Sequence, residues 1–408
     1  MADFGGHDPE AFRAEVRSWL KANYPAELCD PNVKIDPDAV WGGRPFANST
    51  DPHMTWVRKL AERGWTAPTW PRAYGGGGLR QAEAQILAQE ISSGGYREPL
   101  YSMGLWMLGP VLLEFGNEAQ KMEHLPAIAR GEIRWCQGYS EPGAGSDLAS
   151  LSTRCEDKGD HWLINGQKVW TSYAKESDWC FCLVRTDTAK KHEGISLILI
   201  DMASPGVEPR PIKLISGDSD FCETFFTDVK VPKTNVVGEV NCGWEIAKRL
   251  LQYERQNASG VFSEDSGITG GATGDLAQLA KAYVGTDATG AVSDRDLRTR
   301  ITRNKMDFRS LSLTVEREAA ESLANNGLSA ATSIIKYAAA NFGQERSELM
   351  IETLGYQGLG WDGEGFAPDE IVATRGWARS KGFSIEGGTS EVNLNVISKR
   401  VLGLPDSK

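Results

Sequence analysis

A carboxylate interrupts the apolar side of a predicted helix in the stretch GWEIAKRLLQYERQNAS, residues 243–259. Ile246, Leu250 and Ala258 recur at steps of four or eight residues, which predicts the buried face of a helix. One turn after Leu250 the same face holds Glu254, and no Lys or Arg lies three or four residues from it. A carboxylate on an apolar face is costly, so either Glu254 reaches water or some chemistry requires it there.

A second stretch with chemical potential is GYSEPGAGSD, residues 138–147, at the end of the first predicted strand. Its glycines allow close approach of the backbone to a ligand, and the hydroxyls of Ser140 and Ser146 can donate or accept hydrogen bonds. The stretch matches neither the dinucleotide-binding glycine motif nor the P-loop. An ordinary turn is the alternative interpretation.

A third stretch, VWTSYAKESDW (residues 169–179), places an aromatic face beside two hydroxyls. Trp170 could be a platform for a planar cofactor, with Thr171 and Ser172 as polar contacts; a core position is the alternative for the tryptophan. Ser172 and Lys175 also have acyl-serine spacing, but neither of the companion motifs S-D-N and K-T-G follows.

Three zones of different periodicity must position these residues. The pattern is helical to about residue 132, β-rich from 133 to about 241, and helical again from 242 to 408. Asn165-Gly166 predicts a hairpin turn inside the β zone. Between residues 260 and 290, a glycine-rich stretch predicts a loop with one short helix. We therefore predict an α+β protein with domains at 1–132, 133–241 and 242–408.

The composition of the 408 residues is that of an ordinary globular protein, with 24% charged and 40% hydrophobic residues. The net charge of −11 argues against a nucleic-acid partner. No apolar run has the length of a membrane span. The N-terminus predicts an amphipathic helix capped by Asp8, with Val16 and Leu20 inward, rather than a signal peptide, so we expect a cytoplasmic protein without a membrane partner.

Cysteine and histidine spacing excludes the common metal motifs. The seven cysteines form no C-x-x-C pair, and the five histidines have no metal-ligand spacing. We expect reduced structural thiols and no metal.

In order and spacing, several motifs together resemble the acyl-CoA dehydrogenase family. They are GNEAQKMEHLPAIARGE, YSEPGAGSD, INGQKVWTS, ETFFTDVKVPKTNVVGEVNCGW and GGTSEV, and they cover nearly the whole chain. The resemblance implies a helical domain, a β domain and a C-terminal four-helix bundle. It also implies FAD as cofactor and dehydrogenation of an acyl-CoA thioester to the trans-2-enoyl-CoA.

The resemblance assigns site residues by motif position. Substrate contacts with CoA fall to Ser146, Gln252 and Arg255, and the backbone N–H of Gly387 is implied as a donor to the thioester oxygen. The flavin contacts implied are Gln137, Tyr139, Ser140, Gly145, Ser146, Trp170, Thr171, Ser172, Thr389 and Glu391.

Glu254 then has a chemical purpose as the catalytic base. Most family members carry the base immediately before the GTSE-like turn, where this chain has Gly387. A subgroup that includes isovaleryl-CoA and long-chain acyl-CoA dehydrogenases instead carries it in a Glu-Arg pair on the first helix of the bundle, and QYER matches that pair. Glu386, one residue before the usual position, is the rival candidate.

A partner subunit is expected because this chain lacks two features that complete the FAD site in the family. In the family, a neighbouring subunit completes each FAD site with an arginine segment and a glutamine, whereas this chain has no arginine between Gly260 and Ser293 and has Glu352 and Tyr356 near the glutamine position. We expect an α2β2 heterotetramer with a related chain, the alternative being a homodimer or homotetramer, and an electron-transfer flavoprotein as acceptor.

Within the family, the runs EDKGDHWLINGQKVWTS and CETFFTDVKVP look most like the large subunit of pimeloyl-CoA dehydrogenases, which would favour fatty acid or dicarboxylate degradation. Two other functions stay open at this point. One is a non-catalytic structural subunit of a mixed oligomer, and the other is an acyl-CoA oxidase.

Overall fold

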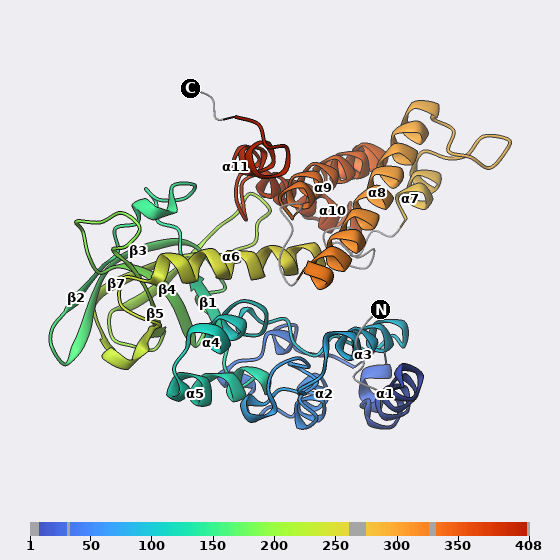
Figure 1. The fold of residues 1–408 in the computed structure, drawn as a ribbon. Coiled ribbons are helices and arrows are strands. Elements are labelled where there is room, and N and C mark those ends of the chain that lie inside the picture. Colours follow the sequence, from blue (N-terminus) through green and yellow to red (C-terminus); the bar gives the residue numbers. More distant parts are fainter. Residues whose placement is uncertain (1–7, 31–32, 261–274, 326–331, 406–408) are drawn as a thin grey trace. The chain divides into compact units, whose positions relative to one another are not determined.

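The computed structural model describes residues 8–30, 33–260, 275–325 and 332–405, without the side chains of 252, 254–260, 319–320 and 322–325. It divides into two compact units: Met1–Pro211 with Phe221–Leu250, and Ile212–Asp220 with Leu251–Lys408. Figure 1 labels the elements of both units. Helix α6, Gly243–Gly260, contributes residues to each of them.

Helices form the N-terminal part of the first unit (Figure 1). The predicted first helix is confirmed: the Asp8 side chain accepts a hydrogen bond from the Glu10 amide at 3.0 Å, and Val16 and Leu20 are fully buried. The helices are α1 Pro9–Asn23, α2 Pro52–Glu62, α3 Gln81–Ser93, the π-helical turn Gly104–Leu108 that leads into α4 Gly109–Phe115, and α5 Glu118–Ala129.

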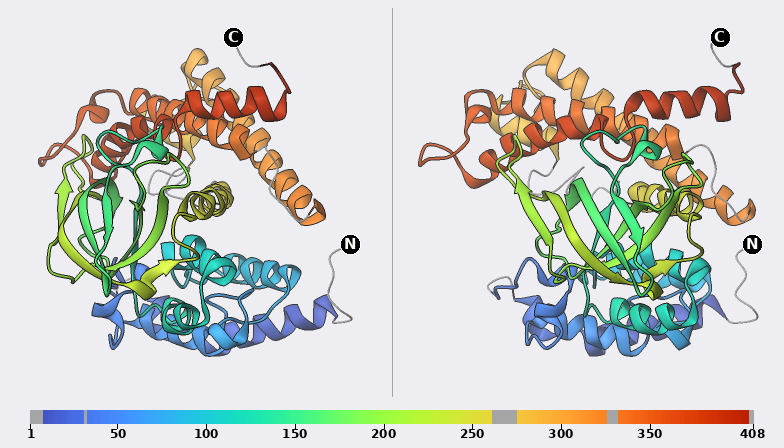
Figure 2. Two further views of the ribbon diagram at one scale, coloured as in Figure 1. Left: turned by 60° about the vertical axis from the view of Figure 1, so that its left-hand side comes forward. Right: turned by 90° about the vertical axis from the view of Figure 1, so that its left-hand side faces the viewer.

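An eight-stranded mixed sheet forms the rest of this unit, and Figure 2 shows its twist. Its strand order is β6-β7-β3-β2-β4-β5-β8, with β1 paired to β4. Strands β1 and β2 run parallel to β4, and the other pairs are antiparallel. The strands are β1 Trp135–Gly138, β2 Arg154–Asp157, β3 His161–Ser172, β4 Trp179–Arg185, β5 Ile195–Asp201, β6 Val207–Ile212, β7 Phe221–Pro232 and β8 Val236–Val237.

The predicted hairpin at Asn165-Gly166 is wrong. Both residues lie inside the continuous strand β3, where the pairing with β7 shifts register between Ile164 and Gly166. A Cβ on Gly166 would lie 2.6–2.8 Å from atoms of Thr153 on the neighbouring β2 side. The glycine therefore allows close packing at a bulge rather than a chain reversal.

The second unit is helical apart from its short 212–220 segment, within the residues that the structure describes. The short helix predicted in the glycine-rich stretch is present as α7 Leu276–Tyr283; residues 261–274 of that stretch lie outside the described part. The predicted α+β fold is confirmed, and the predicted boundaries near residues 132 and 241 stay predictions. The remaining helices are α8 Arg295–Asn325, α9 Thr332–Leu354, α10 Pro368–Ser380 and α11 Ser390–Val396.

Among the described residues, no helix combines the length and the apolar composition needed to cross a membrane. The seven cysteines all lie in described ranges and are free thiols, five of them buried. No group of three or more potential ligands (His, Cys, Asp or Glu) that could hold a metal ion occurs in the described part of the chain.

Candidate active site

Two segments predicted to contact the cofactor, residues 138–147 (the first loop) and 169–172 (the second loop), lie side by side in the first unit. The amide of Val169, near the end of β3, donates a hydrogen bond to the carbonyl of Ser140, just after β1, at 2.9 Å. This single contact aligns residues 138–147 with residues 169–172. The structure thus brings together two segments that are about thirty residues apart in the chain.

Trp170 projects from an irregular point of β3. The pairing with β7 shifts register between Lys168 and Thr171, and Trp170 has a left-handed backbone with φ of 59°. A bulge re-aims a side chain out of the sheet, and the Trp170 ring is 54% exposed. The neighbouring Phe221 ring contacts it edge-on at 6.1 Å between centroids. A core role for Trp170 is therefore excluded.

Two buried polar atoms in these loops have no hydrogen-bond partner within the described part of the chain. They are Nε2 of Gln137 on β1 and Oγ1 of Thr171 at the end of β3. Buried polar groups are normally paired, so these two atoms are available to hydrogen-bond a ligand held between the loops. Gly145 adds an open approach, because a Cβ built there meets no atom within 4 Å. These features fit a bound FAD.

A buried ion pair links the two loops and was not predicted. Lys168 is fully buried, and its Nζ lies 2.8 Å from Oε1 of Glu141 and 3.0 Å from the carbonyl of Tyr139. A sequence signal existed: Lys168 lies on the same side of the two-residue alternation as the buried Trp162 and Ile164. A lysine at a core position requires a counter-charge.

Burial would raise the pKa of Glu141, but the nearby Lys168 charge and hydrogen bonds from Lys168, Thr153 and Ser152 outweigh it and lower the pKa to about 2. The carboxylate accepts from the amides of Ser152 at 2.6 Å and Thr153 at 2.8 Å. Glu141 therefore stays ionised at neutral pH and ties the first loop to Ser152 and Thr153, just before β2.

An aromatic and guanidinium cluster supports the turn after Ser172 and was also not predicted. The ring of Tyr173 lies 4.4 Å from that of Trp41, and the buried Arg134 guanidinium lies over both rings at 5.2 and 4.9 Å. The Asp178 carboxylate accepts from the amides of Arg134 and Arg44 at 2.8 and 2.9 Å. The second loop is thus anchored on both sides.

The base and CoA-contact candidates Gln252, Glu254 and Arg255 lie on α6, and their side chains are outside the described residues. The apolar face that leads to Glu254 is confirmed where it is described, because Ile246 and Leu250 are buried. The first two loops belong to the first unit, and these three residues belong to the second.

The turn before α11 requires glycine. Gly387 and Gly388 have φ of 59° and 92°, in the left-handed region that side chains disfavour. Thr389 caps α11 by accepting from the Val392 amide at 3.2 Å, and Glu391 in its first turn is exposed. The rival base Glu386 is bound by Arg379 at 2.7 Å.

Glu352, which the resemblance places near the family's glutamine position, is also already bound. Both of its oxygens accept hydrogen bonds from the Arg300 guanidinium, each at 2.7 Å. Tyr356 nearby is 76% exposed. This end of the bundle presents an ion pair and an exposed ring.

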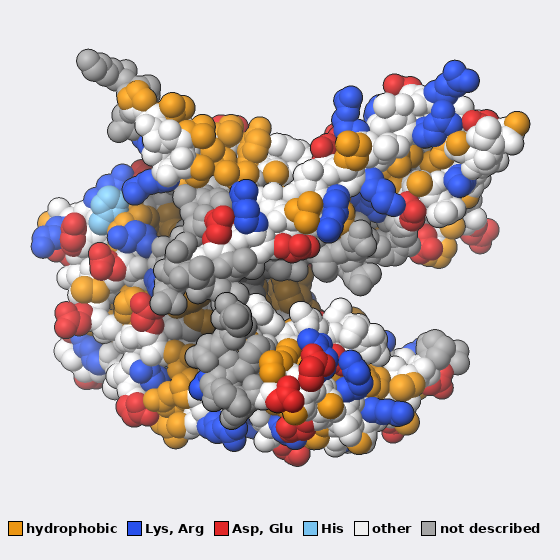
Figure 3. All heavy atoms as spheres, turned by 45° about the vertical axis from the view of Figure 1, so that its right-hand side comes forward, with side chains coloured by type: hydrophobic (Ala, Val, Ile, Leu, Met, Phe, Trp, Pro, Cys, Tyr) orange, Lys and Arg blue, Asp and Glu red, His pale blue; other side chains and the backbone are white. Residues whose placement is uncertain are grey.

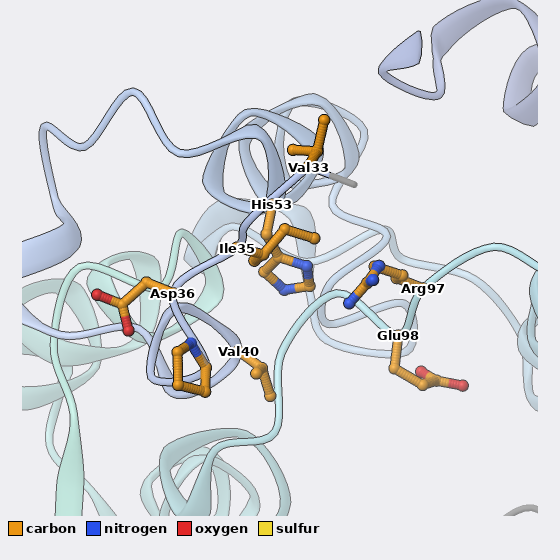
Figure 4. Close-up of a pocket in the computed structure, with 8 residues that line it drawn as sticks. Val33, Ile35, Asp36, Val40, His53, Arg97 and Glu98 are labelled. Carbon is orange, nitrogen blue, oxygen red and sulfur yellow. The ribbon is translucent and has the colours of Figure 1, made fainter. Parts of the chain in front are cut away.

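A cavity of about 430 Å³ opens in the N-terminal part of the first unit, and none of the predicted site residues that the structure describes lines it (Figure 4). His53 in its wall already contacts the Pro99 carbonyl through Nε2 at 2.7 Å, and burial lowers the pKa of His53. None of the described residues that line the cavity has a buried polar side-chain atom without a partner, in contrast to the cofactor loops. We therefore assign the cavity no part in the chemistry. Its lining residues are Val33, Ile35, Asp36, Pro37, Val40, His53, Arg97 and Glu98.

Comparison with known families decides what these loops belong to. The acyl-CoA dehydrogenase N-terminal, middle and C-terminal domain families match residues 7–132, 136–229 and 241–402. Acyl-CoA dehydrogenase IpdE1 of Mycobacterium tuberculosis is 36% identical over 409 residues, 98% of each chain. The chain belongs to the acyl-CoA dehydrogenase family. It is accordingly an oxidoreductase that acts on CH–CH donors, and its cofactor is FAD.

Other relatives agree with this membership. Acyl-CoA dehydrogenase FadE34 of Mycobacterium tuberculosis is 36% identical over 348 residues, 85% of this chain and 45% of FadE34. The solved Tcur3481-Tcur3483 steroid ACAD superposes with a TM-score of 0.73 at 27% identity, covering 98% of this chain and 99% of that one. The ChsE4-ChsE5 complex from Mycobacterium tuberculosis superposes with a TM-score of 0.72 at 27% identity, covering 98% of each chain.

Proposed function

We propose that this acyl-CoA dehydrogenase uses FAD to convert an acyl-CoA thioester to its trans-2-enoyl-CoA. The observation that carries the proposal is the alignment of the two loops through Val169 and Ser140, with unpartnered buried polar atoms on Gln137 and Thr171.

Ten residues would hold the cofactor. Gln137 and Thr171 supply buried polar atoms, and Trp170 supplies an exposed aromatic face. FAD held by these residues would supply the acceptor for the β-hydride of the substrate. The full proposed set is Gln137, Tyr139, Ser140, Gly145, Ser146, Trp170, Thr171, Ser172, Thr389 and Glu391.

Glu254 would remove the α-proton of the thioester. The sequence places Glu254 one turn after Leu250, which is buried on α6. A carboxylate that is poorly solvated is a stronger base toward a neighbouring C–H group. The Gly387 N–H would stabilise the enolate oxygen that develops as the proton leaves. Ser146, Gln252 and Arg255 would contact the CoA part.

A second chain would complete the FAD site in an α2β2 heterotetramer. Glu352 is held by Arg300, so it cannot take the role of the family's glutamine, and the segment between Gly260 and Ser293 contains no arginine. Two of the similar structures, Tcur3481-Tcur3483 and ChsE4-ChsE5, are named as two-chain assemblies. We propose that a related chain supplies the missing cation.

Exposed apolar side chains support an oligomer. They gather beside the C-terminal end of the chain, orange near the grey terminus in Figure 3, and patches of this kind are typical of protein interfaces. The most exposed large hydrophobic residues of α11 and the segment after it are Leu394, Leu402 and Leu404, at 44%, 63% and 52%.

The identity of the acyl group in the substrate is determined with a panel of acyl-CoA thioesters. One of the relatives is described as a steroid ACAD, so the panel contains steroid-linked acyl-CoAs beside linear and ω-carboxylated ones. Anaerobic bleaching of the flavin identifies the substrate, and the enoyl product is identified by mass. An electron-transfer flavoprotein is the proposed acceptor; rapid turnover with oxygen instead would identify an oxidase.

The assembly is tested by expressing this chain alone and measuring its mass in solution and its FAD per protomer. We expect poor flavin retention alone and one FAD per heterodimer with the related chain. A stable homotetramer with one FAD per chain and full activity would refute the heteromer. A flavin-free heteromer would support the structural-subunit alternative.

A further inference from the structure

The buried pair of Lys168 and Glu141 is an unusual way to hold two loops. The lysine side chain is 0% exposed and the glutamate side chain 5% exposed, with 2.8 Å between Nζ and Oε1. Removing two charges from water is costly, and apolar residues of similar size often stabilise a fold as well or better. The pair therefore calls for a reason beyond stability.

The position of the Lys168–Glu141 pair relative to Ser140 supplies a reason for its presence. Lys168 Nζ donates to the Tyr139 carbonyl at 3.0 Å and binds the Glu141 carboxylate, so it holds the residues on both sides of Ser140. The next residue, Val169, donates its amide to the Ser140 carbonyl at 2.9 Å. Lys168 is thus two residues before Trp170 and in contact with both neighbours of Ser140.

Charge at this place acts on any redox group that the loops hold. In a buried, low-dielectric environment an uncompensated charge acts over a longer distance than it does in water. Reduction by a hydride adds negative charge to a flavin, so a nearby positive charge favours the reduced form and a negative charge disfavours it. In the native chain the two charges compensate each other.

We infer that Lys168 and Glu141 are positioning residues for the flavin, which align the two loops through Ser140 and set a nearly neutral potential at the bound cofactor. The inference rests on the proposal that these two loops hold FAD.

The test measures the reduction potential of bound flavin in three variants of the holoenzyme. Glu141→Gln leaves the Lys168 charge unpaired, and we expect the potential to rise. Lys168→Met leaves the Glu141 charge unpaired, and we expect the potential to fall. The double variant removes both charges, and we expect a potential between those of the two single variants. All three should bind FAD at least tenfold more weakly, because the ion pair that supports the backbone hydrogen bond from Val169 to Ser140 is lost.

A matched control separates this effect from a loss of stability. Glu90 on α3 is also buried and paired, with Arg13 and Arg17 at 2.8 Å each, but it lies among the N-terminal helices. Glu90→Gln should lower the melting temperature without changing the flavin potential. If the flavin potential shifts in the same direction in both single variants, the pair is structural only. The same conclusion follows if neither potential shifts by more than it does in Glu90→Gln.

Two further results are decisive. If Lys168→Met does not fold, the Glu141→Gln variant decides alone, and an unchanged potential overturns the inference. If Gln137→Ala and Thr171→Val retain FAD with native affinity and potential, the loops are not the flavin site. That result would refute the proposed FAD site. It differs from the case in which FAD binds at these loops but the Lys168 and Glu141 variants do not shift its potential in opposite directions.

Discussion

The guanidinium of Arg379, near the end of α10, binds the carboxylate of Glu386 at 2.7 Å across the 3-10 turn Lys381–Ser384. Glu386 is the carboxylate nearest to the place where most acyl-CoA dehydrogenases carry their base. Its ion pair gives it a structural partner and leaves Glu254 on α6 as the base that we propose.

We expect Glu254→Gln to retain FAD but to lose flavin reduction by substrate. The amide keeps the size of the side chain and cannot accept the α-proton, and general-base catalysis contributes about 10²–10⁴-fold. Anaerobic stopped-flow absorbance measures the loss. Glu386→Gln is the matched variant and should reduce its flavin at nearly the parent rate; the reverse outcome would reassign the base.

We expect Ser172→Ala and Trp170→Ala to lower flavin content or slow flavin reduction without unfolding the chain. Trp170 is largely exposed and lies at a bulge, so its removal creates no core cavity. Flavin absorbance per protein and the melting temperature are measured on both. Trp162→Ala, which empties a buried position on the same strand, should show a clear drop in melting temperature. Full flavin occupancy with a large drop in melting temperature in Trp170→Ala would make that residue structural.

We expect acid to remove a part of the stability that Glu141 supplies. Its pKa in the folded chain, about 2, lies below the ordinary value of 4.5. The contribution, about 3 kcal/mol as an upper estimate, is therefore complete above pH 4.5 and is lost as the pH falls toward 2. Urea unfolding from about pH 2 to 7 measures it across this range. The free energy of unfolding of Glu141→Gln should depend less on pH than that of the parent. Glu239→Gln, at an exposed site, should follow the parent. Parallel curves for Glu141→Gln and the parent would contradict the low pKa assigned to Glu141.

We expect Gly166→Ala to destabilise the first unit by about 1–3 kcal/mol, because the new Cβ would overlap Thr153. The melting temperature and urea unfolding measure the effect. Gly376→Ala is the control: this glycine lies in α10, and a Cβ added to it would meet no atom within 4 Å, so alanine there should be neutral or slightly stabilising. Equal effects at both sites would contradict the bulge explanation.

The sequence by itself determined the local features of this protein. The Asp8 cap and the inward Val16 and Leu20 follow from helical periodicity and cap chemistry, which act over a few residues. The apolar face of α6 up to Leu250 follows in the same way. The family was also readable, because several motifs in a fixed order have little chance of arising together.

Only the tertiary structure decided the contacts between distant segments. Lys168 meets Glu141 across 27 residues, and nothing local to either residue states the pairing. Asn165-Gly166 has the composition of a hairpin turn, yet β3 continues through it because β2 and β7 pair on both sides. A buried charge or a close packing contact takes its meaning from the neighbours that the fold provides, and these lie far away in the sequence.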